Sequence, residues 1–143
     1  IGTGGKDISP EKALDHIYGY AVGLDMTRRD LQGEMKKMGR PWEIGKAFDH
    51  AAPCSAITPV SDFGHLDHGK IWLKVNGEDR QDGDLNQLIW KTPNMMSYLS
   101  GLFELFPGDL IYTGTPAGVG PIVAGDVMLG GIDGLGELKI TVT

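Results

Sequence analysis

Glycine is the residue that most constrains how this chain can fold. The 143 residues include 22 glycines, which is about twice the ~7% share of an average protein. They are scattered along the chain and follow no fixed period, so neither a collagen-like nor a low-complexity segment accounts for them. Because glycine permits tight turns, we expect a fold built from many short strands and turns.

Composition and charge exclude several classes of protein. Hydrophobic residues make up 41% and charged residues 22% of the chain, as in ordinary soluble domains. The net charge of -6 disfavours nucleic acid or an anionic membrane as a partner, because both require a basic face. The lone Cys54 cannot form an internal disulfide, which fits a cytoplasmic location. We expect one domain over residues 1–143 with a proper hydrophobic core.

Local patterns predict an α+β domain with strands at its centre and two principal helices. Thr27 and Asp30 resemble a capping box, Gly39 is a stop signal for the helix that follows, and Asn76-Gly77 is a strong hairpin signal. The expected elements are a short helix from Ser9, a buried strand over 17–24, a helix over 27–38, loop with short strands over 43–70, strands over 71–75 and 78–81, a helix from Thr92 with Met96, Leu99, Leu102 and Phe103 on one face, a buried strand over 110–113, and strands over 127–129 and 138–142.

A candidate polar site follows the first expected strand. Asp25 stands at its end, and Arg29 and Gln32 come four and seven residues later, which would put all three on one helical face. Such a trio can act as a ligand for a hard cation, a clamp for a carboxylate and an orienting amide. The commoner interpretation of this spacing is that Asp25 caps the helix and pairs with Arg29 on the surface.

Two further segments are candidates for ligand contact. Lys46 lies among apolar neighbours and can stabilise developing negative charge, although most such lysines extend to solvent. The glycine-rich loop over 114–120 is not a phosphate-binding loop, but its backbone can approach a small ligand, and Thr113 and Thr115 offer hydroxyls.

Other reactive side chains are poorly supported as sites. His65 and His68 lie three residues apart, yet no second pair of ligands has a spacing that suits a metal. Ser55 and Cys54 lack the surroundings typical of a catalytic nucleophile.

Taken together, seven blocks of the sequence resemble the fumarylacetoacetate hydrolase family in their order and separation. Arg28-Arg29 and Trp42 are most similar to the fumarylpyruvate-hydrolase-like and acylpyruvase-like branch. The matching blocks are residues 18–20, 25–32, 40–42, 46–49, 72–77, 107–111 and 113–120.

The resemblance implies a mixed β-roll fold, a homodimer and a Mg²⁺ or Mn²⁺ ion. In the family, an Asp at the position of Asp25 binds the metal together with two Glu residues of an upstream Glu-x-Glu strand. Arg29 and Gln32 fall on positions that hold substrate oxygens. Lys46 matches the lysine that stabilises the charged intermediate, and Thr115 matches a loop threonine that contacts substrate. The upstream strand, and the lid that carries the general base, are expected to precede residue 1, so the domain is expected to be N-terminally incomplete.

The activity implied by the resemblance is hydrolysis of a carbon–carbon bond in a β-diketo acid. An example is fumarylpyruvate, which gives fumarate and pyruvate in the catabolism of aromatic compounds. Oxaloacetate decarboxylation and dienedioate isomerisation are alternatives, because all three reactions require an enolate held on a divalent cation. Outside the enzymes, a catalytically inactive binding module is the remaining alternative.

Overall fold

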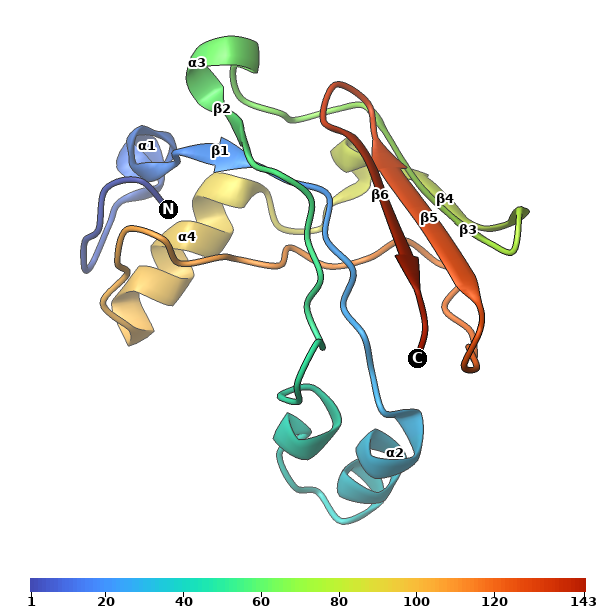
Figure 1. Ribbon diagram of the computed structural model, residues 1–143. Helices are drawn as coiled ribbons and strands as arrows, with labels where there is room; N and C mark the ends of the chain where they lie inside the picture. The colour runs from blue at the N-terminus through green and yellow to red at the C-terminus, as the bar shows by residue number, and fades with distance from the viewer.

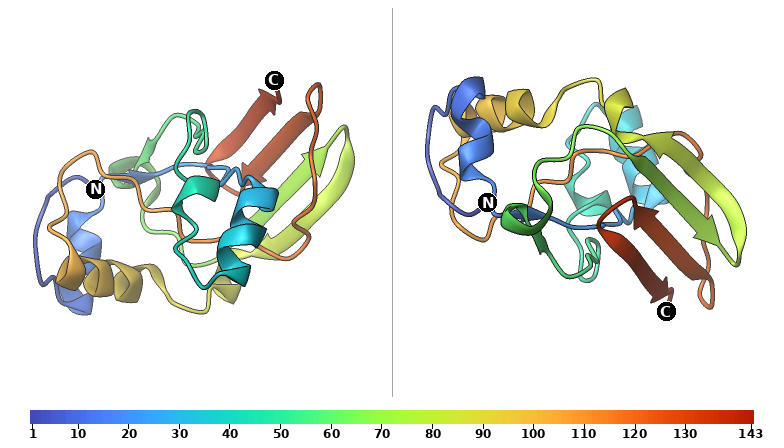
Figure 2. Two further views of the ribbon diagram at one scale, coloured as in Figure 1. Left: turned by 90° about the horizontal axis from the view of Figure 1, so that it is seen from below. Right: turned by 90° about the horizontal axis from the view of Figure 1, so that it is seen from above.

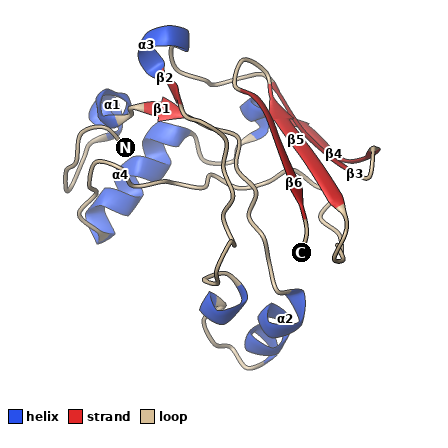
Figure 3. Cartoon of the chain, in the orientation of Figure 1, coloured by secondary structure: helices blue, strands red, loops and turns tan.

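Three parts make up the molecule, and they lie at separate positions (Figure 1). The computed structural model describes all residues 1–143. A four-stranded sheet and a pair of helices lie on opposite sides in every view, and a small helical lobe projects from between them (Figures 1 and 2). Long irregular segments connect these parts (Figure 3). The mixture of helices and antiparallel strands agrees with the expected α+β class.

The sheet is antiparallel throughout, with strand order β4-β3-β5-β6. Its strands are β3 (Lys70–Val75), β4 (Glu78–Asp84), β5 (Val127–Ile132) and β6 (Gly136–Thr141). The predicted hairpin is confirmed, since Asn76 and Gly77 join β3 to β4 with φ angles of 53° and 84°. Both angles lie in the left-handed region that the tight hairpin turn requires. A larger residue than glycine does not fit at Gly131, because the indole of Trp72 occupies the space that its side chain would need.

The helix pair consists of α1 (Pro10–Ala13), continued by η1 (Leu14–His16), and α4 (Thr92–Leu102). Its core contains Ile8, Ala13, Ile17, Met96 and Leu105. The expected apolar face of α4 is only partly correct. Met96 is 1% exposed, whereas Leu102 and Phe103 are 59% and 62% exposed. The last turn of the helix thus buries Ser100 and leaves the side chain of Leu102 exposed.

A second, smaller core lies on the sheet and contains Leu24, Val75 and Met128. The chain buries only 14 residues in all. Its accessible surface is 9107 Å², against about 7,200 Å² for a compact monomer of 15.4 kDa. The expectation of one proper core is therefore wrong, because the apolar residues are divided between two small clusters and many remain exposed.

The strand expected over 17–24 is mostly irregular. Only β1 (Gly19–Tyr20) is a strand, paired with β2 (Thr58–Pro59), and a single bridge joins Gly23 to Cys54. Pro53 lies in the partner segment and has no N–H to donate, so the ladder is not continuous. The loop expected over 43–70 is confirmed, with η2 (Glu43–Gly45), β2 and α3 (Val60–Phe63) as its short elements.

The buried strand expected over 110–113 is absent. Residues 110–115 make no backbone–backbone hydrogen bond, and Leu110 and Tyr112 are 53% and 38% exposed. The apolar run satisfies the pattern of a buried strand, but no other segment of residues 1–143 pairs with it. Its side chains instead line an apolar groove of about 460 Å³ between the helix pair and the sheet, together with residues such as Ile17, Ile71 and Met95.

The helical lobe contains α2 (Arg29–Lys37) and η2. The helix ends as predicted, with Gly39 at φ 63° just beyond it. Its predicted start is wrong, because the N-cap residue is Arg28 and no side chain caps the helix.

Outside the lobe, a short helical turn, η3 (Leu85–Gln87), follows β4 and has the capping box formed by Asp84 and Gln87. None of the helices combines the length and hydropathy that a membrane crossing needs.

The buried hydroxyl of Ser100 provides a test of the helix pair. It accepts a hydrogen bond from the Ile8 amide at 2.9 Å and donates one to the Ser97 carbonyl. Ser100→Ala should lower the free energy of unfolding by about 1–3 kcal/mol, because the buried Ile8 amide loses its partner. Ser97→Ala is the matched control and should change stability by less than about 0.5 kcal/mol. Equal effects of the two substitutions in urea denaturation would contradict this account.

Candidate active site

Two extended segments, residues 22–26 and 51–55, run side by side and form the base of the site. Leu24 donates its amide to the Pro53 carbonyl at 3.0 Å, and Met26 donates to Ala51 at 2.8 Å. We call this pairing the central ladder. Leu24 packs into the core of the sheet, whereas the neighbouring Asp25 is exposed, as expected for successive side chains of an extended segment. The helical lobe is therefore formed by the part of the chain that connects the two segments.

Lys46 and Asp25 form the central ionic contact. The Lys46 ammonium donates to Oδ1 and Oδ2 of Asp25 at 2.8 and 2.7 Å, and to Thr27 Oγ1 at 2.8 Å. All three ammonium hydrogens are thus engaged. The side chains of Lys46 and Asp25 are 33% and 49% exposed, and Lys46, but not Asp25, lines an open pocket formed by residues 46–53. Both side chains are therefore accessible to solvent.

Thr27 is a site residue that the sequence analysis missed. Its pattern with Asp30 indicated a capping box, but its hydroxyl donates to the Asp25 carbonyl at 3.3 Å and accepts from Lys46. A cap requires a hydroxyl that is free to accept from the first turn of the helix. The only local signal for the observed role is that Thr27 lies two residues after Asp25, which puts both side chains on one side of an extended segment.

Arg29 and Gln32 lie on α2 and contact each other. The guanidinium of Arg29 donates to Gln32 Oε1 at 2.9 Å. The expectation of one helical face shared with Asp25 is wrong, because Asp25 precedes the N-cap and lies in extended chain. The alternative is not observed either, since Asp25 pairs with Lys46 and not with Arg29. No hydrogen bond joins the Arg29–Gln32 pair to the Asp25–Lys46 pair.

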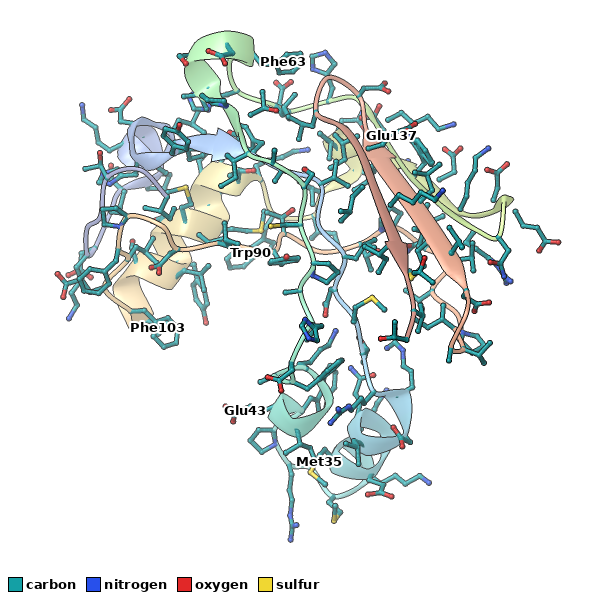
Figure 4. All side chains as sticks on the ribbon, viewed as in Figure 1. Met35, Glu43, Phe63, Trp90, Phe103 and Glu137 are labelled. Carbon is teal, nitrogen blue, oxygen red and sulfur yellow. The ribbon has the colours of Figure 1, made fainter.

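The backbone that carries Lys46 is held tightly against α2. Arg28 donates its amide to the Gly45 carbonyl at 3.0 Å, and its guanidinium lies 4.4 Å from the centre of the Phe48 ring. Gly45 is buried, and a Cβ atom there would lie 3.1 Å from the backbone nitrogen of Gln32. Met35 lies in the lower part of this lobe and Glu43 at its side, both away from the sheet (Figure 4). Close packing at Gly45 therefore fixes the lysine relative to the helix.

Tyr112 connects the unpaired segment over 110–115 to the central ladder. Its hydroxyl donates to the Ala52 carbonyl at 2.8 Å, and its ring fills the space beside Gly23. Burial, followed by the proximity of Cys54 and Asp25, raises the pKa of the Tyr112 hydroxyl. The hydroxyl therefore stays protonated at neutral pH and continues to donate.

Thr115 belongs to the glycine-rich loop that follows this segment. Its hydroxyl accepts a hydrogen bond of 2.8 Å from Gln81 Nε2 in β4. Thr115 is exposed and makes no hydrogen bond to Asp25, Arg29 or Lys46. The structure thus attaches the loop to the sheet and leaves the hydroxyl hydrogen of Thr115 without a protein acceptor.

The histidines and the candidate nucleophiles have other partners. His65 forms a hydrogen bond of 2.9 Å with the Tyr20 hydroxyl, and His68 forms one with Asp67. Burial raises the pKa of the Tyr20 hydroxyl. The Ser55 hydroxyl is used within the backbone of its own segment and that of Val22. None of these contacts converges on Asp25.

The donor set for a metal ion is incomplete within residues 1–143. No group of three or more His, Cys, Asp or Glu side chains is arranged to hold an ion. Asp25 is an exposed carboxylate of the kind that Mg²⁺ and Mn²⁺ prefer, so it fits as one ligand. A hard divalent ion needs further oxygen ligands besides this one.

The chain is similar to several known proteins. The family model described as "Fumarylacetoacetate (FAA) hydrolase C-terminal" matches residues 1–143. Fumarylpyruvate hydrolase of Ralstonia sp is 46% identical over 142 residues, which cover 99% of this chain and 73% of that protein. Mitochondrial oxaloacetate tautomerase of Arabidopsis thaliana is 43% identical over 142 residues, 99% of this chain and 64% of the relative.

A solved structure shares the whole fold. The crystal structure of fumarylpyruvate hydrolase from Pseudomonas aeruginosa, in complex with Mn²⁺ and pyruvate, is 60% identical and superposes with a TM-score of 0.97. The match covers 100% of this chain and 61% of that one, so the chain spans between 61% and 73% of the length of these three relatives. The fold class and the resemblance expected from the sequence are confirmed, and the chain belongs to the fumarylacetoacetate hydrolase family.

Proposed function

We propose that this chain forms part of the active site of an enzyme that hydrolyses a carbon–carbon bond in a β-diketo acid such as fumarylpyruvate, giving fumarate and pyruvate. The observation that carries the proposal is the Lys46 ammonium held on Asp25 and Thr27 at an open surface. A cation in this position can stabilise an oxyanion. The family members with 46% and 60% identity that act on fumarylpyruvate support the choice of substrate.

The proposal includes Mg²⁺ or Mn²⁺ bound by Asp25, and the Pseudomonas relative in complex with Mn²⁺ supports it. When bound, such an ion polarises the substrate carbonyl and stabilises enolate charge. Asp25 cannot offer both oxygens fully to an ion and to Lys46. With Asp25 bound to such an ion, the Lys46 ammonium, oriented by Thr27, would be available to stabilise the oxyanion that forms when water adds.

The remaining residues bind and orient the substrate in this proposal. Arg29 presents a guanidinium that binds a carboxylate with two parallel hydrogen bonds. Gln32 already accepts from Arg29, so it holds the guanidinium in place and offers its amide N–H groups to a second substrate oxygen. Thr115 donates its hydroxyl hydrogen from the loop. Two cations and several neutral donors thus match a dicarboxylate substrate.

Oxaloacetate is the second candidate substrate, because the Arabidopsis relative is an oxaloacetate tautomerase. Both chemistries pass through an enolate next to a carboxylate and use the same residues. Oxaloacetate decarboxylation, dienedioate isomerisation and an inactive binding module are the alternatives that an assay has to separate. A homodimer and a cytoplasmic location stay part of the proposal, although the plant relative is mitochondrial by name.

A substrate panel tests the proposed reaction. The whole protein, assayed with Mg²⁺ or Mn²⁺, should cleave fumarylpyruvate to fumarate and pyruvate with a higher kcat/KM than acetylpyruvate. It should release no net carbon dioxide from oxaloacetate. If the protein cleaves neither acylpyruvate but rapidly interconverts the enol and keto forms of oxaloacetate, the proposed hydrolase activity is wrong and the protein is a tautomerase.

Lys46→Met tests the role of the ammonium. Loss of one oxyanion donor typically costs about 2.7–4 kcal/mol of transition-state stabilisation, so kcat should fall by about 10²–10³-fold, with a much smaller change in KM. Lys37→Met, at the exposed end of α2, is the matched control and should leave both parameters unchanged. An unaltered kcat in Lys46→Met would remove this residue from the chemistry.

Calorimetric titration with Mn²⁺ tests the assignment of Asp25. Residues 1–143 alone should bind the ion weakly or not at all, because one carboxylate competes poorly with hydration. A chain as long as its relatives should bind tightly and lose most of that affinity on Asp25→Asn. Asp30→Asn, on the exposed first turn of α2, should bind as the wild type does. Tight binding by residues 1–143 that survives Asp25→Asn would contradict the assignment.

A further inference from the structure

The side chain of Gln81 in β4 ties the glycine-rich loop to the sheet. Its Nε2 donates to Thr115 Oγ1 at 2.8 Å and to the Pro116 carbonyl at 2.7 Å. Gln81 is half-buried, whereas Thr115 is exposed. These two hydrogen bonds join residues that are more than thirty positions apart in the sequence, and nothing in the proposed chemistry uses Gln81 directly.

The chemistry of the partners fixes the direction of both hydrogen bonds. The carbonyl oxygen of Pro116 can only accept, so the Gln81 atom beside it must be the NH₂ group. The second hydrogen of this nitrogen points to Thr115 Oγ1, which therefore accepts. A threonine hydroxyl has one hydrogen to give, and the structure shows no protein acceptor for that of Thr115. The hydroxyl is consequently set up to donate away from Gln81.

The fold explains why Gln81 reaches the loop. The register of β3 with β4 shifts by one residue between Leu73 and Lys74, which leaves Arg80 as the extra residue of a β-bulge. Bulges redirect the side chains beside them. Gln81 pairs with Leu73, which packs against the core around Leu24, so Gln81 lies on the face of the sheet that the segment leading to Asp25 covers.

Gly118 shows how closely the loop approaches the bulge. It has a φ of 101°, and a side chain there would collide with the Arg80 carbonyl oxygen. The loop thus lies directly on the bulged backbone, and the two hydrogen bonds of Gln81 lock it there.

We infer that Gln81 is a positioning residue that makes Thr115 an obligatory hydrogen-bond donor and so favours a carboxylate over a neutral group at this point of the substrate. The inference rests on the proposed function, in which Thr115 faces the substrate. An ionised carboxylate only accepts hydrogen bonds, and a hydroxyl with a free hydrogen suits it. A hydroxyl whose hydrogen is already used presents lone pairs to the carboxylate and repels it.

Two substitutions of similar size separate positioning from simple support of the loop. Gln81→Met and Gln81→Glu both remove the hydrogen bond to Pro116, so both loosen the loop. They differ at Thr115, because a Glu carboxylate accepts the hydroxyl hydrogen and turns it away from the substrate, whereas Met leaves it free. In the whole protein with Mn²⁺, KM for fumarylpyruvate should rise at least tenfold in Gln81→Glu and only a few fold in Gln81→Met.

A Thr115→Val background controls for the added negative charge of Glu. Without the hydroxyl, the two Gln81 variants should have KM values within about twofold of each other. In Thr115→Ser, which keeps a hydroxyl, their difference should return. Equal KM values in the wild-type background, or a Glu-specific loss that persists in Thr115→Val, would overturn the inference.

Product binding distinguishes failure of this inference from failure of the proposed function. If no β-diketo acid is cleaved, the proposed function is wrong, and dissociation constants for fumarate and pyruvate replace KM in the same set of variants. Weaker binding of either acid to Gln81→Glu than to Gln81→Met, abolished by Thr115→Val, would then support the role of Gln81. Identical binding of both acids to the two variants would overturn it.

Discussion

The central ladder, in which residues 22–26 pair with residues 51–55, is the contact on which the rest of the site depends. It closes the helical lobe into a loop and brings Lys46 to Asp25. An ion pair as exposed as this one contributes only about 0–1 kcal/mol. Burial of a side chain such as Leu24 in the core of the sheet is worth about 1.5–3 kcal/mol, so packing and backbone pairing position the charges, and the charges add little to the fold.

Because packing and backbone pairing position the charged side chains, even a small and loosely packed chain can hold polar residues in fixed places. Of the residues proposed for the site, Arg29, Gln32 and Lys46 lie in the lobe, Asp25 lies in the ladder with Thr27 just after it, and Thr115 lies in the glycine-rich loop. Specific contacts hold each part in place: Gly45 packs against α2, Tyr112 bonds to Ala52, and Gln81 bonds to the loop. Figure 2 shows the lobe in projection between the helix pair and the sheet, and Figure 1 shows it extending away from both.

Local sequence signals predicted the features that local interactions determine. The Asn76-Gly77 hairpin and the end of α2 at Gly39 follow from backbone angles that these residues tolerate. The strands expected over 17–24 and 110–113 did not form, because a strand needs a neighbour with free N–H and C=O groups as well as an apolar run. Pro53 interrupts the partner of the first, and no segment pairs with the second.

The family resemblance predicts a set of site residues, which stays a prediction, and it predicts none of the contacts that the structure shows among them. Thr27 matched a helix cap because its true partner, Lys46, lies far along the chain. Gln81 gave no signal at all, since its role depends on a bulge in β4 and on a loop more than thirty residues away. Long-range contacts between polar side chains leave no periodic pattern, so only the folded chain reveals them.

The most direct test of this account is a crystal structure of the whole protein with Mn²⁺ and pyruvate, with the metal located by its anomalous scattering. The account predicts that Asp25 ligates the ion and that the Lys46 ammonium, still bonded to Thr27, turns from Asp25 towards a pyruvate oxygen. A metal bound elsewhere, with the contact between Lys46 and both Asp25 oxygens intact, would contradict it.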